Sequence, residues 1–230
     1  MRLDYFIATT TTLSRRDAKK AISAGLVKVD DQTCRKAATP VVRESEITFE
    51  GQPLSLPGER YLMLHKPRGV ISATTDSQQP TALDLLPAGI RYGLHIAGRL
   101  DADTTGLLLL TTDGQWSHRI TSPRVNCPKT YRVTLREAID ETAIARLEQG
   151  VLLRNESRPT APARVHRLED RLIDLTISEG RYHQVRRMLA AVGNHVDSLH
   201  RWRIGDIVLD PALAPGQYRE LNADEVDCLG

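Results

Sequence analysis

The chain has 230 residues, and its 31 Lys and Arg against 29 Asp and Glu give a formal net charge of only +2 at pH 7. This balance does not by itself indicate a polyanionic partner, so any basic surface depends on where the charges lie. Cys34, Cys127 and Cys228 are far apart and form no CxxC pair, which argues against a disulfide framework and a cysteine-rich zinc site. The length is sufficient for one large and one small domain.

The amino-terminal stretch MRLDYFIATT is charged and lacks an apolar signal core, and no uncharged apolar run is long enough to cross a bilayer. Together with the cysteine usage, this predicts a cytoplasmic protein that does not contact a membrane.

Residues 1–50 are predicted to form a small domain. An apolar patch at its start is followed by Ser14, which is typical of a helix cap, and by a helix over Arg15–Ala24 that ends at Gly25. Short strands are expected at Val27–Val29 and Ile47–Phe49. The segment GQPLSLPGE, residues 51–59, combines glycine and proline with few apolar residues and is expected to be a linker.

Residues 60–230 are predicted to form a second, larger domain. Strands are expected at 61–65, 107–111, 130–135, 171–178 and 196–202, and helices at 115–121, 140–149 and 182–192. This alternation has no fixed repeat. It therefore predicts an α+β fold with a mixed, mostly antiparallel sheet.

The stretch GRLDADTTGLLLLT, residues 98–111, contains the first candidate for chemistry. Its leucine run predicts a strand covered on both faces, so Asp101 is expected on a loop at the start of a rigid element, where a carboxylate can act on a ligand. The alternative is that Asp101 and Arg99 form a surface pair and that Asp103 only caps a turn.

Basic residues are concentrated on the first predicted helix. Arg15, Arg16, Lys19 and Lys20 form a stripe that can follow phosphates, although such a stripe can also be a solvated face. The segments RLDYFIA and LSRRDAKKAISAGLVKVDD around this stripe resemble the S4 RNA-binding module. This resemblance favours RNA binding for residues 1–50.

The second domain has three further candidate clusters. In EGRYHQVRRM, Arg186 lies beside the apolar face of the predicted helix, where a cation can pair with a carboxylate. His183 can position RNA or bond the local backbone, and Arg187 can be a solubilising residue or contact phosphate. Basic residues at strand ends can hold an RNA backbone, and the residues in such positions are Lys66, Arg68 and Lys129. Tyr131 can stack on a base or belong to the core.

The ordered motifs YLMLHKPRGVISAT, AGRLDADTTGLLLLT, SHRITSPR, KTYRVTL and EGRYHQVRRM resemble those of bacterial pseudouridine synthases in the branch with an amino-terminal S4 module. The resemblance covers nearly the whole chain. It implies isomerisation of a uridine without a cofactor or a metal, with Asp101 as the catalytic carboxylate. It further implies that Arg186 pairs with Asp101 and that Tyr131 stacks on or bonds the uracil. The residues expected to contact RNA are Arg15, Arg16, Lys19, Lys20, Lys66, Arg68, Arg99, Lys129, His183 and Arg187.

Within this branch, the resemblance points to 16S ribosomal RNA, free or in a small-subunit assembly particle, as the partner of a monomeric enzyme. Large-subunit ribosomal RNA is the alternative substrate. Two other classes stay open: a catalytically silent RNA-binding assembly factor, and a glycosidic hydrolase that uses Asp101 and Asp103 as paired carboxylates. The hydrolase would leave the RNA-binding module unexplained. The chain has no GxxxxGK[ST], GxGxxG, HExxH or GxSxG motif, so nucleotide hydrolysis, nicotinamide redox chemistry, zinc proteolysis and serine hydrolysis lack support.

Overall fold

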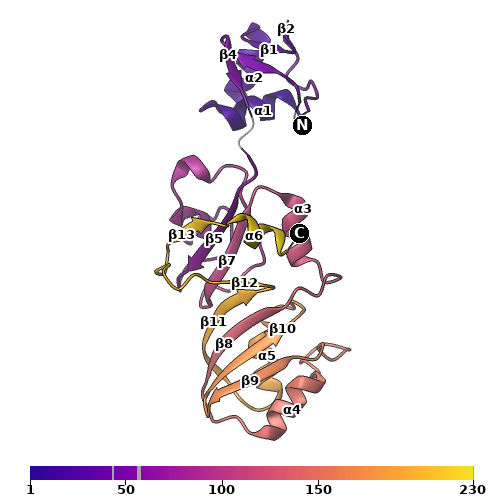
Figure 1. Ribbon diagram of the computed structural model, residues 1–230, viewed down its shortest axis with the longest axis vertical. Coiled ribbons are helices and arrows are strands. Elements are labelled where there is room, and N and C mark those ends of the chain that lie inside the picture. Colours follow the sequence, from indigo (N-terminus) through magenta and orange to yellow (C-terminus); the bar gives the residue numbers. More distant parts are fainter. Residues whose placement is uncertain (43, 56–57, 230) are drawn as a thin grey trace. The chain divides into compact units, whose positions relative to one another are not determined.

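The computed structural model describes residues 1–42, 44–55 and 58–229 (Figure 1). The chain divides into two compact units, Met1–Glu59 and Arg60–Gly230. Among the described residues, none of the helices combines the length and the apolar character that crossing a membrane would require.

The first unit combines two helices with a four-stranded sheet in the order β2-β1-β3-β4. Its elements are α1 (Leu3–Thr10), α2 (Arg15–Ala24), β1 (Val27–Val29), β2 (Gln32–Thr33), β3 (Ile47–Phe49) and β4 (Gln52–Leu54). The predicted helix is confirmed with both ends. The Ser14 side chain accepts a hydrogen bond from the backbone N–H of Asp17, and Gly25 closes the helix in the left-handed conformation with φ 82°.

The predicted linker at 51–59 is wrong in part, because residues 52–54 form strand β4, which pairs with β3. Pro53 does not prevent this, since β4 is at the edge of the sheet and an edge position needs no further backbone donor. Residues 56–57 of the predicted linker lie outside the described residues. Helix α1 was not expected either; it contributes Leu3, Phe6 and Ile7 to the core of the unit.

The second unit contains a nine-stranded sheet. Its main path runs β13-β5-β7-β11-β8-β10-β9, while β12 pairs with β11 and β6 with β7. The strands are β5 (Tyr61–Lys66), β6 (His95–Ala97), β7 (Thr105–Thr111), β8 (Lys129–Leu135), β9 (Arg164–Glu169), β10 (Leu172–Ile177), β11 (Val196–Ile204), β12 (Ile207–Val208) and β13 (Tyr218–Glu220). Among the named strands of the described residues, β7 and β11 pair in parallel and the other pairings of this sheet are antiparallel, so the α+β prediction with a mostly antiparallel sheet is confirmed.

Strand β7 is covered on both faces, as its leucine run predicts. Leu108 and Leu110 belong to one apolar cluster, and Leu107 and Leu109 belong to another. The first cluster is completed by the turn helix η1 (Ala82–Leu85), and the second by α3 (Gly114–Thr121). The strand that follows the Asp101 loop is therefore a rigid support.

The parallel contact between β7 and β11 requires a glycine. Gly106 has φ 108°, and a Cβ at this position would lie 2.1 Å from the backbone oxygen of Arg201. Any other residue would push the two strands apart. The close approach therefore fixes the start of β7, directly after the Asp101 loop.

Helices α4 (Glu141–Gln149) and α5 (Gln184–Ala191) contribute to the cluster around β8 and β10. From α5, Val185, Met188 and Leu189 are buried in it. The helix starts at Gln184 and not at the predicted 182, because His183 is in the left-handed conformation with φ 47°. The remaining elements are η2 (Ala88–Ile90) and α6 (Ala223–Asp227).

Candidate active site

Asp101 lies in the loop between β6 and β7 and lines a cleft of about 570 Å³. Clefts of this size hold small organic ligands, and a nucleoside is in that class. The loop is closed by a backbone hydrogen bond of 3.1 Å from Thr104 N–H to the Asp101 carbonyl. The Asp101 side chain is 36% exposed, so its carboxylate is held by the loop and is accessible to a ligand.

The cleft is formed by the Asp101 loop, β8, β11 and the segment that leads into α5. Its lining includes Arg99, Leu100, Asp101, Thr104, Lys129, Tyr131, Glu179, Tyr182, His183, Arg186 and Arg201. Four of the residues expected to act on or near the substrate are thus brought together from distant parts of the chain: Asp101, Tyr131, His183 and Arg186.

The two carboxylates of the loop have different partners. Nε2 of His183 lies 3.4 Å from Oδ1 of Asp101, whereas Nη2 of Arg186 donates to Oδ2 of Asp103 at 2.8 Å. The expected pairing of Arg186 with Asp101 is therefore wrong. The reason is geometric: His183 precedes α5 in the left-handed conformation and its ring lies beside Asp101, whereas Arg186 extends from the first turn of the helix to Asp103.

Tyr131 is half-buried on β8 and lines the cleft. The guanidinium carbon of Arg201 lies 6.0 Å from the centre of its ring, which is at the limit of a cation–π contact. Contact between Tyr131 and a uracil stays a prediction, and the position of the ring in the cleft is compatible with it.

Lys66 does not have the role expected of it. Its side chain is fully buried, and Nζ donates to the backbone carbonyls of Pro67 at 2.9 Å, Thr104 at 2.8 Å and Ala102 at 3.4 Å. Burial lowers the pKa of Lys66 to about 8, against the nearby charges of Asp103 and Asp101, which raise it. Lys66 therefore cannot contact an RNA backbone, and instead fixes the loop that carries both carboxylates.

Arg201 supports the same loop and was missed by sequence reasoning. It is 2% exposed, and its guanidinium donates to the carbonyls of Leu107 at 3.0 Å, Gly98 at 3.0 Å and Arg99 at 3.4 Å. The signal was present in the strand alternation, which places Arg201 on the same side of β11 as the buried Leu199. Lys66 and Arg201 thus hold the two ends of the Asp101 loop through backbone carbonyls.

The other basic residues of this unit differ in how accessible they are. Arg68 and Arg99 are exposed, and Arg99 lines the cleft. Lys129 is half-buried and donates to the carbonyl of Ile120 at 3.0 Å, and burial lowers its pKa. Arg187 forms an ion pair of 2.6 Å with Glu156 and donates to the carbonyl of Tyr182 at 3.2 Å, so it is engaged within the protein.

In the first unit, the basic stripe of α2 lies next to a buried carboxylate. Arg15 and Lys19 approach Oδ2 of Asp4 at 3.4 and 3.9 Å, and Arg2 approaches it at 3.0 Å. Burial raises the pKa of Asp4, but hydrogen bonds from Arg2 and Arg15 and their charges outweigh this and lower it. The cationic side chains remain about half exposed, so contact with phosphates stays a prediction for Arg15, Arg16, Lys19 and Lys20.

Within the described parts of the chain, no group of three or more His, Cys, Asp or Glu side chains is placed to hold a metal ion. The groups that line the cleft and can act on a ligand are carboxylate, aromatic, imidazole and guanidinium side chains.

Comparison with known proteins identifies the class to which this fold and cleft belong. Residues 60–191 match the family described as RNA pseudouridylate synthase, and residues 1–47 match the S4 domain. The chain therefore belongs to the RNA pseudouridylate synthase family and carries an S4 domain before the synthase domain. The resemblance seen in the sequence motifs is confirmed.

Similarity to individual proteins extends over the full length. The chain is 49% identical to the ribosomal small subunit pseudouridine synthase A of Haemophilus influenzae over 100% of this chain and 99% of that protein. It is 50% identical to the protein of the same name from Escherichia coli K12 over 98% of each. A crystal structure of a pseudouridylate synthase superposes with a TM-score of 0.74, at 48% identity and covering 100% of both chains.

Proposed function

We propose that this chain converts one uridine of 16S ribosomal RNA to pseudouridine, with Asp101 as the catalytic carboxylate. The observation that carries the proposal is the position of Asp101 in a nucleoside-sized cleft, on a loop held by Lys66 and Arg201. The substrate is proposed from the full-length similarity to small-subunit enzymes.

The reaction breaks the bond between N1 of uracil and C1′ of ribose and forms a bond between C5 and C1′. C5 loses a proton and N1 gains one, so the step is a balanced isomerisation that requires no oxidant and no group donor. A carboxylate serves this chemistry in two ways, either as a nucleophile at the ribose or as a base toward the neighbouring sugar proton. Both routes require Asp101 at the ribose, and the exposed carboxylate at the cleft supports both.

The neighbouring side chains have distinct roles in this proposal. Tyr131 contacts the uracil ring from β8. Arg186 acts through Asp103 and not through Asp101, so it positions the loop and contributes positive charge at the cleft. His183, 3.4 Å from Asp101, orients the catalytic carboxylate and is in reach of RNA.

RNA is held by both units in this proposal. The basic stripe of α2 and the exposed Arg68 and Arg99 contact the phosphate backbone, while the choice of site comes from RNA shape and from extrusion of the base into the cleft. Because an unpaired segment is less costly to open, a partly assembled small subunit is proposed as a substrate beside free RNA. The enzyme is proposed to act as a monomer in the cytoplasm.

The test compares unmodified 16S RNA, unmodified 23S RNA and a small-subunit assembly particle as substrates of the purified protein, with pseudouridine mapped at nucleotide resolution. One modified uridine in 16S RNA, free or in the particle, and none in 23S RNA is the expected result. Modification of 23S RNA alone would refute the proposed substrate while leaving the role of Asp101 intact.

A further inference from the structure

Tyr182 is exposed to an unusual degree for its position at the rim of the cleft. The residue is 76% accessible, more than any other large apolar or aromatic residue in the described parts of the chain. Single exposed aromatic residues are common on protein surfaces. This residue is distinguished by its neighbours and by how firmly its backbone is held.

One face of the Tyr182 ring is stacked on His183. The ring centres are 3.9 Å apart and the planes differ by 18°. On the other side of the pair, Nε2 of His183 lies 3.4 Å from the Asp101 carboxylate. A continuous series of contacts therefore leads from the catalytic carboxylate through an imidazole to a tyrosine ring. Since His183 covers one face of that ring and the side chain is largely accessible, the opposite face is open.

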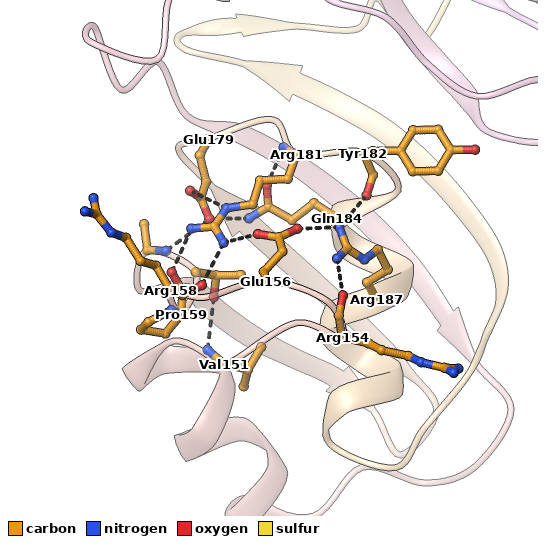
Figure 2. Close-up of polar contacts among 12 residues, drawn as sticks. Val151, Arg154, Glu156, Arg158, Pro159, Glu179, Arg181, Tyr182, Gln184 and Arg187 are labelled. Atoms are coloured by element: carbon orange, nitrogen blue, oxygen red, sulfur yellow. Dashed lines mark hydrogen bonds and ion pairs between the residues drawn. The ribbon is translucent and has the colours of Figure 1, made fainter.

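The backbone of this pair is held by a clamp formed by Arg181, Arg187 and Glu156 (Figure 2). Arg181 lies 2.5 Å from one oxygen of Glu156 and Arg187 lies 2.6 Å from the other, so a single carboxylate joins the residues on both sides of the pair. Arg187 also donates to the carbonyl of Tyr182 at 3.2 Å. Figure 2 shows the ring of Tyr182 pointing away from the clamp, with none of its atoms joined to the polar network.

The clamp also accounts for the conformation of His183. A non-glycine residue with φ 47° is strained, and the structure shows no side-chain hydrogen bond that caps α5 at this position. Arg181 adds hydrogen bonds to the carbonyls of Arg158 at 3.0 Å and Pro159 at 2.7 Å, which ties the segment to a second loop. The aromatic pair is thus pre-organised, and ordering it on binding has little cost.

We propose that Tyr182 is a stacking platform for the nucleobase adjacent to the target uridine. The inference rests on the proposed function: when the uridine leaves its stack to enter the cleft, the adjacent base loses a stacking neighbour. The open face of Tyr182 replaces that neighbour, because any base can stack on an aromatic ring. Tyr182 therefore stabilises bound RNA with its target base extruded, and Glu156 is a positioning residue for this platform.

The test measures kcat and KM for pseudouridine formation on an unmodified 16S RNA transcript. Tyr182→Ala is expected to raise KM about tenfold and to change kcat less than twofold, in the range of loss of one base–aromatic stack. Tyr182→Phe, which keeps the ring, is expected to stay within twofold of the wild type. Tyr92→Ala is the matched control, because Tyr92 is an exposed tyrosine of the same unit that does not line the cleft.

A second arm measures RNA affinity in the inactive Asp101→Asn background by fluorescence anisotropy. The 16S transcript is used first, and then synthetic RNA segments with an abasic nucleotide on either side of the mapped uridine. One abasic position is expected to weaken binding as much as Tyr182→Ala does, and to have no further effect when both changes are combined. Glu156→Gln is expected to raise KM in the wild-type background, and this effect on KM should be absent in the Tyr182→Ala background, where the ring that the clamp positions is missing.

An unchanged KM and an unchanged RNA affinity for Tyr182→Ala would overturn the platform. So would a double change in which the loss of affinity from Tyr182→Ala multiplies the loss from the abasic nucleotide, whichever side of the uridine that nucleotide is on. Absence of pseudouridine from 16S RNA with the wild-type protein would instead overturn the proposed function. In that case the comparison of transcript affinity with and without the Tyr182 ring still decides whether the ring binds RNA.

Discussion

Replacing Lys66 with methionine should remove activity while leaving the fold largely intact. Methionine keeps the length of the side chain but removes the ammonium that donates to the carbonyls of Pro67 and Thr104 at 2.9 and 2.8 Å. Each buried carbonyl that loses its donor costs about 1–3 kcal/mol. Against this, Lys66→Met also removes the cost of burying a charge, which the drop in pKa from 10.5 to about 8 places at roughly 3 kcal/mol.

These opposing effects leave a net loss of at most about 3 kcal/mol in the free energy of unfolding, or about 10 °C in Tm for a chain of this size. The catalytic effect should be much larger, because the carbonyl of Thr104, next to Asp103, loses the Lys66 donor, and the carbonyl of Ala102 keeps only its backbone hydrogen bond from Gly69. A displacement of about 1 Å in a reacting group costs about 100-fold in rate.

The assay for Lys66→Met combines thermal unfolding followed by circular dichroism with single-turnover pseudouridine formation on the 16S transcript. We expect a cooperative transition within about 10 °C of the wild type together with a rate at least about 100-fold lower. A variant with the wild-type rate would show that the loop does not depend on Lys66. A variant that does not fold would show that the two energetic effects do not offset each other.

Three further predictions concern Lys66, the ion pair between Asp103 and Arg186, and the basic stripe of α2. Between pH 8 and 10.5 the unfolded chain keeps a proton on Lys66 that the folded chain has released, so raising the pH favours the folded state. The free energy of unfolding of the wild type, measured with urea relative to Lys66→Met, should therefore rise across this interval, and a fall would refute the buried ammonium. Asp103→Asn should lower kcat/KM by no more than about fivefold, because its ion pair with Arg186 is half exposed; a loss as large as that of Asp101→Asn would give Asp103 a direct role in the chemistry. The double variant Arg15→Gln/Lys19→Gln should reduce the slope of log affinity against log salt concentration by about one unit per lost phosphate contact. RNA-binding anisotropy at several salt concentrations measures this slope, and an unchanged slope would mean that the stripe is only a solvated face.

The sequence predicts those parts of the fold in which local chemistry and periodicity agree. Helix α2 is found with its predicted bounds because Ser14 and Gly25 supply the capping groups, and β7 is found because a run of leucines needs cover on both faces. The short edge strand β13 pairs with β5, which is distant in the sequence, so local composition gives little sign of it. Strand β4 pairs with its neighbour β3 across residues 50–51, and it was missed because the glycine and prolines of this segment indicate a linker. Helix α1 was missed because three apolar residues alone do not define a helical period.

For the site, the sequence identifies Asp101 and its cleft neighbours but not which groups pair. Asp101 and Asp103 are two residues apart on one loop, and only side-chain geometry assigns His183 to the first and Arg186 to the second. Lys66 illustrates the same limit. A lysine at the end of a strand can point outward to RNA or inward to backbone carbonyls. Two of the carbonyls that hold Lys66 inward, those of Ala102 and Thr104, lie 36 and 38 residues further along the chain, where local sequence gives no sign of them.

We propose that the Asp101 carboxylate performs the isomerisation of a uridine in 16S RNA. The most direct measurement compares the wild type with Asp101→Asn in single-turnover reactions on the unmodified 16S transcript, with transcript affinity measured in parallel. The amide keeps the size and polarity of the side chain but can neither attack the ribose nor accept a proton usefully. We expect no detectable pseudouridine with the variant and an affinity within about twofold of the wild type. Pseudouridine formation by Asp101→Asn at a rate near that of the wild type would contradict it.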